Sequence, residues 1–146
     1  MKIKVEYGDF SEAEVILRCR QGDEEALSLQ TLLHEHAARL AAYRENEIFL
    51  IEPIDLLYAE AVDGKTFVYT VKQVLETKLT LMQIHTRYED NGIVRIGKSQ
   101  LINLYQVAKL KSLPYSRMEV TLKNGERLIV SRHYSNEIKE RLGLFD

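Results

Sequence analysis

Apolar and polar residues alternate along much of this sequence, and a period of two is typical of β-strands. The alternation is clear in Met1–Tyr7 and Ala13–Arg20, and it returns in Met118–Leu122. The pairs Asp63-Gly64 and Asn124-Gly125 separate apolar runs and predict hairpin turns, the second being the strongest type I′ signal. The pattern therefore predicts a chain of many short strands. Further strands are predicted over residues 39–44, 47–51, 55–60, 66–70, 72–76, 93–97, 107–113 and 128–131.

Helical spacing of apolar residues is confined to three stretches. The first begins after Asp23, which can cap a helix that runs to about His36. The second lies within residues 77–88, with Thr77 or Thr80 as its cap, and the third covers residues 135–142 before Gly143. We therefore expect short helices between the strands.

The most informative stretch is Ile93–Asn103, which reads Ile-Val-Arg-Ile-Gly-Lys-Ser-Gln-Leu-Ile-Asn. A polar break, Gly97-Lys98-Ser99, divides two apolar runs, and glycine permits backbone angles that other residues avoid. We expect a strand, a tight surface turn, and then either a second strand or one turn of helix. Lys98 and Ser99 would point outward and suit phosphate or base-edge contacts, although most exposed Lys-Ser pairs are simply solvated.

Length and composition favour one soluble domain with a short appendage. The chain has 146 residues, 29% of them charged, and no apolar stretch approaches the roughly 20 residues of a membrane span. Its start alternates and carries an acid, so it does not look like a signal peptide. The single cysteine, Cys19, excludes an internal disulfide and a multi-cysteine zinc site. A cytoplasmic location is the simplest expectation.

The net charge of −2 hides an asymmetry along the chain. Residues 1–60 contain six Lys/Arg and thirteen Asp/Glu, a net charge of −7, whereas residues 61–146 contain fourteen and nine, a net charge of +5. Residues 91–133 alone carry eight bases and two acids. Such a split is typical of a nucleic-acid-binding face opposite an acidic end, and scattered charge on two solvated surfaces explains it equally well.

Three more motifs join the Ile93–Asn103 stretch. They are Leu57–Thr70 with its Asp-Gly turn, Arg117–Glu126 with its Asn-Gly turn, and Ile129–Tyr134, which reads Ile-Val-Ser-Arg-His-Tyr. In this order and spacing the four motifs resemble the LytTR family of bacterial DNA-binding transcriptional regulators, over about residues 46–144. The resemblance implies a mainly β protein, α+β overall, with an elongated multi-stranded β fold and short helices.

The resemblance also implies a division of the chain. Residues 46–146 would form the LytTR-like DNA-binding domain. The resemblance does not cover residues 1–45 in the same way, and their own pattern predicts a strand-strand-helix arm, a candidate for dimerisation or partner contact. That arm resembles what precedes the domain in stand-alone family members. Because 45 residues cannot hold a receiver domain, we do not expect control by aspartate phosphorylation within this chain.

In the LytTR family, loops and not a recognition helix are presented to DNA. The matching positions here lie in three loops, Gly64–Thr66, Gly97–Ser99 and Ser131–Tyr134. The family often has a second arginine where this chain has His133. Asn103 matches a family asparagine, but we expect it to hydrogen-bond the backbone at the base of its loop. The DNA-binding residues implied by the resemblance are Lys65, Thr66, Lys98, Ser99, Arg132 and His133.

Other residues near these loops have simpler interpretations. Lys109, Lys111, Arg117 and Lys123 are candidates for phosphate contacts, and a solvated charged face explains them equally well. Tyr134 can stack on a base, but packing at the boundary of the core is the stronger expectation. The aromatic and aliphatic residues expected in the core are Tyr58, Phe67, Tyr69, Leu101, Ile102 and Leu122.

The sequence, together with this resemblance, therefore predicts a transcriptional regulator that binds double-stranded DNA sequence-specifically. It would read major-groove edges through its loops and bind repeated half-sites as a dimer. The alternative is a protein-interaction module whose acidic arm is held by a membrane protein or another partner. An enzyme is disfavoured, because no base–nucleophile constellation is visible and no glycine-rich loop would cradle a phosphate. The four histidines form no metal motif, and we expect no cofactor and no small-molecule substrate.

Overall fold

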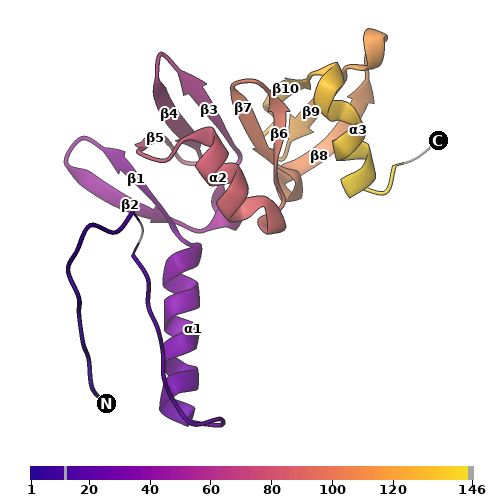
Figure 1. Cartoon of the computed structure of the whole chain (residues 1–146). Helices are drawn as coiled ribbons and strands as arrows, with labels where there is room; N and C mark the ends of the chain where they lie inside the picture. Colours follow the sequence, from indigo (N-terminus) through magenta and orange to yellow (C-terminus); the bar gives the residue numbers. More distant parts are fainter. Residues whose placement is uncertain (12, 145–146) are drawn as a thin grey trace. The chain divides into compact units, whose positions relative to one another are not determined.

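The computed structural model describes residues 1–11 and 13–144. Glu12, Phe145 and Asp146, which fall in the expected arm and domain, lie outside the described residues. The chain divides into two units, Met1–Glu35 and His36–Asp146. Its described residues form ten strands and three α-helices (Figure 1). The expectation of a mainly β protein with short helices is therefore confirmed.

The first unit differs from the expected strand-strand-helix arm. Its described residues before Gly22 contain no strand, and Ile3 and Tyr7 are 85% and 93% exposed. The two strands expected there were wrong, because alternation gives a stable strand only where a neighbouring strand bonds the backbone and the apolar face is covered. The helix is confirmed as α1 (Glu24–Ala38), since the Ala26 N–H donates to Asp23 Oδ1 at 3.1 Å.

A seven-stranded antiparallel sheet, here called the large sheet, forms most of the second unit. Its strand order is β2-β1-β5-β4-β3-β7-β6. Tyr43 of β1 pairs with Glu76 of β5, so the β1–β2 hairpin spans the boundary that we expected between residues 45 and 46. The strands are β1 (Leu40–Arg44), β2 (Glu47–Ile51), β3 (Tyr58–Val62), β4 (Lys65–Tyr69), β5 (Val74–Thr77), β6 (Ile93–Gly97) and β7 (Gln100–Asn103).

A three-stranded antiparallel sheet, the small sheet, contains β8 (Val107–Ser112), β9 (Met118–Leu122) and β10 (Arg127–Val130). The turn between β9 and β10 is not the expected type I′ turn, because only Gly125 of the Asn124-Gly125 pair has a positive φ, of 90°. The Gly125 N–H donates to Leu122 O at 2.9 Å, and Leu122 N–H to Glu126 O at 2.8 Å. A three-residue loop with glycine in the left-handed region fits these bonds.

The face of the large sheet that α2 (Leu81–Tyr88) covers contains the first core. Thr80 begins the helix with a capping box, since its side chain accepts from the Gln83 N–H at 3.1 Å while its own N–H donates to Gln83 Oε1 at 2.9 Å. The buried residues of the first core are Leu40, Ala42, Ile51, Leu56, Ala59, Val68, Leu75, Leu81, Ile84, Tyr88, Ile93 and Leu101.

The opposite face of β3, β6 and β7 packs against the small sheet and α3 (Arg132–Arg141), and this is the second core (Figure 1). Leu101 and Ile102 are adjacent in β7 and enter different cores, so this hairpin is buried on both faces. The buried residues of the second core are Leu57, Tyr58, Val94, Ile96, Ile102, Met118, Val120, Leu122, Val130 and Ile138.

Candidate nucleic-acid interface

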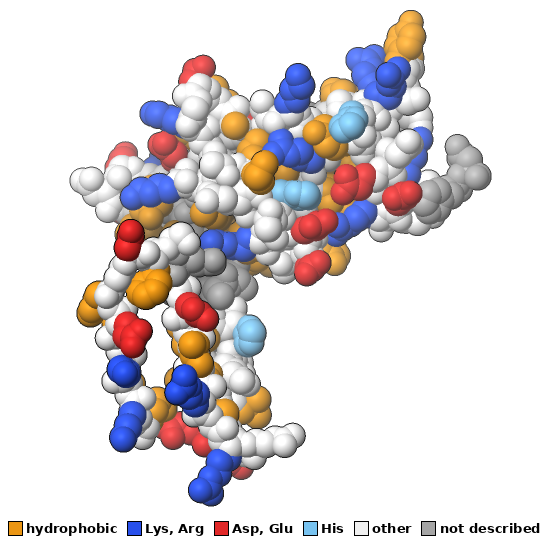
Figure 2. Space-filling model, viewed as in Figure 1, with side chains coloured by type: hydrophobic (Ala, Val, Ile, Leu, Met, Phe, Trp, Pro, Cys, Tyr) orange, Lys and Arg blue, Asp and Glu red, His pale blue; other side chains and the backbone are white. Residues whose placement is uncertain are grey.

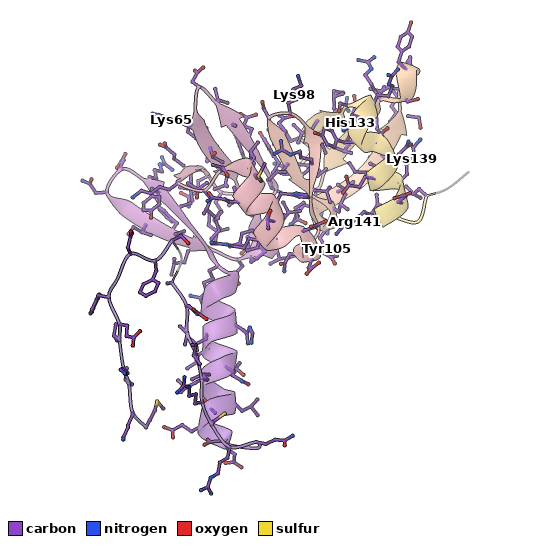
Figure 3. All side chains as sticks on the ribbon, viewed as in Figure 1. Lys65, Lys98, Tyr105, His133, Lys139 and Arg141 are labelled. Carbon is purple, nitrogen blue, oxygen red and sulfur yellow. The ribbon has the colours of Figure 1, made fainter. Side chains whose placement is uncertain are left out.

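Main-chain hydrogen bonds bring the three candidate loops to one end of the large sheet. The Ala61 N–H, just before the β3–β4 turn, donates to Ser99 O in the β6–β7 turn at 2.9 Å. The Ser131 N–H, just before α3, donates to Ile96 O at the end of β6 at 2.9 Å. The labelled side chains of Lys65, Lys98 and His133 lie along the same upper margin in Figure 3. These three segments together are the turn edge.

The first part of the turn edge is the β3–β4 hairpin. Asp63 and Gly64 both have positive φ, 52° and 77°, as the predicted two-residue hairpin turn requires. Lys65 follows the turn and is exposed. Thr66 is only 8% exposed, because it lies inside the sheet between Ala61 of β3 and Thr77 of β5. Of the two residues expected at this turn, only Lys65 is at the surface.

The second part is the β6–β7 turn, in which Lys98 and Ser99 are exposed as expected. The run after the polar break is a second strand and not a turn of helix. Arg95 Nη1 donates to Lys98 O at 2.7 Å, and this hydrogen bond stabilises the turn. Gly97 does not have the positive φ that we expected for it, and instead follows a register shift after Arg95.

The third part is the start of α3, where the structure replaces the expected loop by helix. Ser131 is the N-cap residue, and Arg132 and His133 are the first two residues of the helix, both exposed. The Ser135 hydroxyl, in the first turn of α3, donates to Ser116 O at 2.7 Å. Ser116 lies between β8 and β9, so this bond holds the start of the helix to the small sheet. Arg132 therefore adds its charge to the partial positive charge of a helix N-terminus.

Tyr134, beside the turn edge, and Asn103, at the other end of β7, have structural roles. Tyr134 is half-buried against the second core, and its ring meets His133 edge-on with centroids 4.7 Å apart. Asn103 is fully buried: Nδ2 donates to Leu56 O at 2.9 Å and Pro53 O at 3.2 Å, and Oδ1 accepts from the Tyr105 N–H at 3.0 Å. The expected packing of Tyr134 is confirmed. The backbone bonding of Asn103 is confirmed too, but its place at the base of the turn was wrong, because Asn103 pairs with Ile93 at the other end of the hairpin.

A row of polar side chains crosses the outer face of the small sheet. Lys109, Thr121 and Arg127 lie directly opposite one another on β8, β9 and β10, on the face away from the buried Val120. The sequence analysis missed Arg127, because its place beside Lys109 depends on the hairpin register and not on local spacing. Lys111 lies opposite Glu119, which offsets part of its charge. The four candidate phosphate contacts, Lys109, Lys111, Arg117 and Lys123, are all exposed.

A cluster of tyrosines and acids lies where the large sheet meets the small one. The Tyr58 and Tyr69 rings stack at 4.0 Å; Tyr58 Oη donates to Glu126 Oε1 at 3.1 Å, and Tyr69 Oη to Glu60 Oε1 at 2.6 Å. Burial, followed by the hydrogen bond to Glu60, raises the pKa of Tyr69 to about 12. Burial and Glu126 raise the pKa of Tyr58 still further. Both phenols therefore stay neutral. Tyr58 joins the large sheet to Glu126 after β9, whereas Tyr69 bonds Glu60 within the large sheet.

The residues expected in the core are mostly confirmed. Tyr58, Leu101, Ile102 and Leu122 are buried, while Phe67 and Tyr69 are half-buried. In the described part of the chain, no helix combines the length and apolar character that crossing a membrane requires.

Comparison with known proteins identifies the family. The LytTr DNA-binding domain profile matches residues 46–143. The sensory transduction protein LytT of Bacillus anthracis is 29% identical over 104 residues, a match that covers 71% of this chain and 42% of that protein. An uncharacterized HTH-type transcriptional regulator of Staphylococcus aureus (strain NCTC 8325) is 29% identical over 105 residues, which cover 72% of this chain and 71% of the other.

A solved structure gives the same result for the fold. A LytTr DNA-binding domain from Bacillus cereus superposes with a TM-score of 0.68 at 21% identity, and covers 73% of this chain and 97% of that domain. The chain belongs to the LytTR family of DNA-binding domains. The chain spans less than half the length of the Bacillus anthracis relative that it matches.

Proposed function

We propose that this protein is a bacterial, cytoplasmic transcriptional regulator that binds double-stranded DNA sequence-specifically through the turn edge. One observation carries the proposal: main-chain hydrogen bonds hold the turns of Lys65 and Lys98 and the helix start of Arg132 at one end of the large sheet. Three exposed cations on rigid segments suit a polyanion, and membership of a DNA-binding family identifies that polyanion as DNA.

The side chains of the turn edge are suited to reading base edges in the major groove. Arg132 can grip O6 and N7 of guanine in two-point geometry, and Lys98 can contact the same atoms or a phosphate. Ser99 can donate to a base or a phosphate oxygen. His133 offers less charge than an arginine, so it contributes more to hydrogen bonding than to attraction. Thr66 is too buried to join these contacts.

The cations of the small sheet extend the contact along the DNA backbone. Lys109 and Arg127 lie in one cross-strand row, and Lys111, Arg117 and Lys123 are also exposed. Lys109, Lys111 and Arg127 lie in strands, and Arg117 and Lys123 flank β9, so these cations are spread over the small sheet and we assign them to phosphates. Two copies of the protein would bind repeated half-sites on the DNA.

Fluorescence anisotropy tests this function. A labelled duplex taken from the DNA upstream of the protein's own coding region is compared with a scrambled duplex at several salt concentrations. Tighter binding to the native duplex that survives near-physiological salt supports sequence-specific regulation. Equal binding to both duplexes that salt abolishes contradicts it, because only the nonspecific electrostatic part would then be present.

A second candidate function is a protein-interaction module that a membrane protein or another partner holds. The apolar side chains exposed in the first unit favour it: Ile3, Val5 and Tyr7 are 85%, 63% and 93% exposed. Titrating the labelled protein with a membrane extract in the absence of DNA, and then adding the native duplex, separates the two functions. The family is one of non-enzymatic regulators, and we propose no catalysis and no small-molecule substrate.

A further inference from the structure

One group of metal-ligating side chains lies away from the turn edge. His85 in α2, Glu89 at the start of the 3-10 turn η2 (Glu89–Asn91), and Glu137 in α3 each offer one ligand atom, and these atoms all lie within 4.8 Å of one another. Figure 2 shows a histidine and several acidic side chains gathered over α2 and α3. His85 and Glu89 belong to one segment, and Glu137 follows about fifty residues later in the sequence. The two segments lie on opposite sides of strand β6.

Backbone and side-chain contacts hold the group together. His85 and Glu89 are four residues apart at the end of α2, so they lie on the same side of that helical segment. Arg141 Nη2, one turn after Glu137 on α3, donates to Glu89 O at 2.9 Å. Because α2 and α3 also bury Ile84 and Ile138 in their respective cores, neither helix can move away from the other without unpacking.

The donor set is suited to a divalent cation. His85 Nε2 is buried and has no hydrogen-bond partner among the described residues, although a buried ring nitrogen needs one. Glu89 and Glu137 bring two negative charges, which a divalent cation neutralises. One imidazole and two carboxylates are ligands that zinc takes at about 2.0–2.2 Å in tetrahedral geometry.

The distances allow such a site to close. Tetrahedral bonds of that length place neighbouring donor atoms about 3.4 Å apart. The donors here lie within 4.8 Å of one another, so they need to approach by at most about 1.4 Å. Rotation of two partly exposed glutamate side chains supplies a movement of this size without a change in the backbone.

We propose that His85, Glu89 and Glu137 form a zinc site that clamps α3 to the end of α2, with solvent as the fourth ligand. Three protein ligands and one open position are typical of zinc sites that are not purely structural. Glu137 lies in the second half of α3, away from the first residues of the helix. The zinc site therefore does not compete with DNA at the turn edge. The inference is independent of the proposed function.

The test uses the full chain and Zn²⁺ itself, titrated in competition with a chromophoric chelator. Glu137→Gln and Glu89→Gln each remove one ligand charge and keep the side-chain shape. Glu140→Gln is the matched control, because Glu140 is exposed on the same helix and carries the same charge. We expect one equivalent of Zn²⁺ to bind the wild type and the control, at least tenfold more tightly than either ligand variant. Zn²⁺ should raise the melting temperature of the wild type and of Glu140→Gln, but not that of the two ligand variants.

Two results would overturn the proposal. Equal zinc affinity in all four proteins would place the ion elsewhere, for example at the exposed Cys19 or His34 of the first unit. Absence of zinc binding to the wild type, with no change of its melting temperature in Zn²⁺, would mean that the three side chains hold no metal.

Discussion

Two stretches of this chain share an alternating pattern and differ in structure. Met1–Tyr7 alternates Ile3, Val5 and Tyr7 with charged residues, yet its described residues form no strand and these side chains are largely exposed. Ile93–Asn103 forms β6, a short turn and β7, and every apolar side chain in it is at most 2% exposed.

The difference lies in what surrounds each stretch. The two runs of Ile93–Asn103 are three residues apart, so little entropy is lost in pairing them, and β7 also pairs with β3. Both faces of this hairpin are then covered, one by α2 and the other by the small sheet and α3. Alternation therefore indicates that a segment can form a strand, and neighbouring strands and covered faces decide whether it does.

The largest expected effect concerns the residue that ends this hairpin. Asn103→Ala removes three hydrogen bonds from a fully buried position. It leaves the Leu56 carbonyl and the Tyr105 N–H without these partners, while Pro53 O still accepts from the Leu56 N–H at 3.2 Å. We expect the free energy of unfolding to fall by about 3 kcal/mol in urea denaturation. The control is Asn124→Ala, which removes one bond from an exposed residue and should cost about 1 kcal/mol or less. Equal losses in the two variants would contradict a structural role specific to Asn103.

A matched pair of valines tests the comparison directly. Val94→Ala empties space in the second core, where Val94 is fully buried, and should lower the free energy of unfolding by about 2 kcal/mol. Val5→Ala makes the same chemical change at a side chain that is 63% exposed, and should alter it by less than about 0.5 kcal/mol. If Val5→Ala proves as costly as Val94→Ala, the first stretch is packed and the contrast between the two regions is false.

A smaller effect is expected at alkaline pH, from Tyr69 of the stacked tyrosine pair. The pKa of Tyr69 is about 12 in the folded protein against 10.0 ordinarily, so folding favours the neutral phenol. This stabilisation is complete below about pH 10 and is lost as the pH rises toward about 12. We measure the free energy of unfolding by urea denaturation at each pH. Its decrease at alkaline pH should be about 1 kcal/mol smaller in Tyr69→Phe than in the wild type, after allowance for solvent screening.

The control for this pH experiment is Tyr105→Phe, because Tyr105 is 58% exposed and lies away from the tyrosine pair. That variant should follow the wild-type curve. A Tyr69→Phe protein that loses stability between about pH 10 and pH 12 as steeply as the wild type would show that other groups dominate the alkaline transition.

Much of the second unit could be predicted from local sequence. The Asp63-Gly64 turn, the Thr80 cap and most strands depend on residue types that are close together in the chain. The features that were missed depend on distant partners. Thr66 is buried because β4 pairs with both β3 and β5, and Arg132 begins a helix whose preceding residue, Ser131, is bonded to Ile96.

The dependence on distant partners also explains how much of the candidate site could be predicted. The resemblance to a family placed Lys98 and Arg132 on loops, but their meeting at one end of the sheet follows from hydrogen bonds between segments far apart in sequence. The spacing of His85 and Glu89 is visible in the sequence, whereas Glu137 joins them only through the packing of α3. Local patterns thus identified residue types, and only the tertiary structure identified their neighbours.

The most direct test of the turn edge compares two lysines at opposite ends of the large sheet. Lys98 lies in the β6–β7 turn. Lys72 lies in the connection after β4, a strand that runs about 13 Å from Lys65 to Tyr69. Each alanine variant removes one exposed positive charge, so the net charge of the protein changes equally in both.

The measurement is anisotropy of the native duplex as a function of salt. Lys98→Ala should weaken binding at least tenfold and reduce the slope of log affinity against log salt by about 1, while Lys72→Ala should leave both nearly unchanged. Equal effects of the two variants, or an intact affinity in Lys98→Ala, would contradict the assignment of the turn edge as the DNA-binding surface.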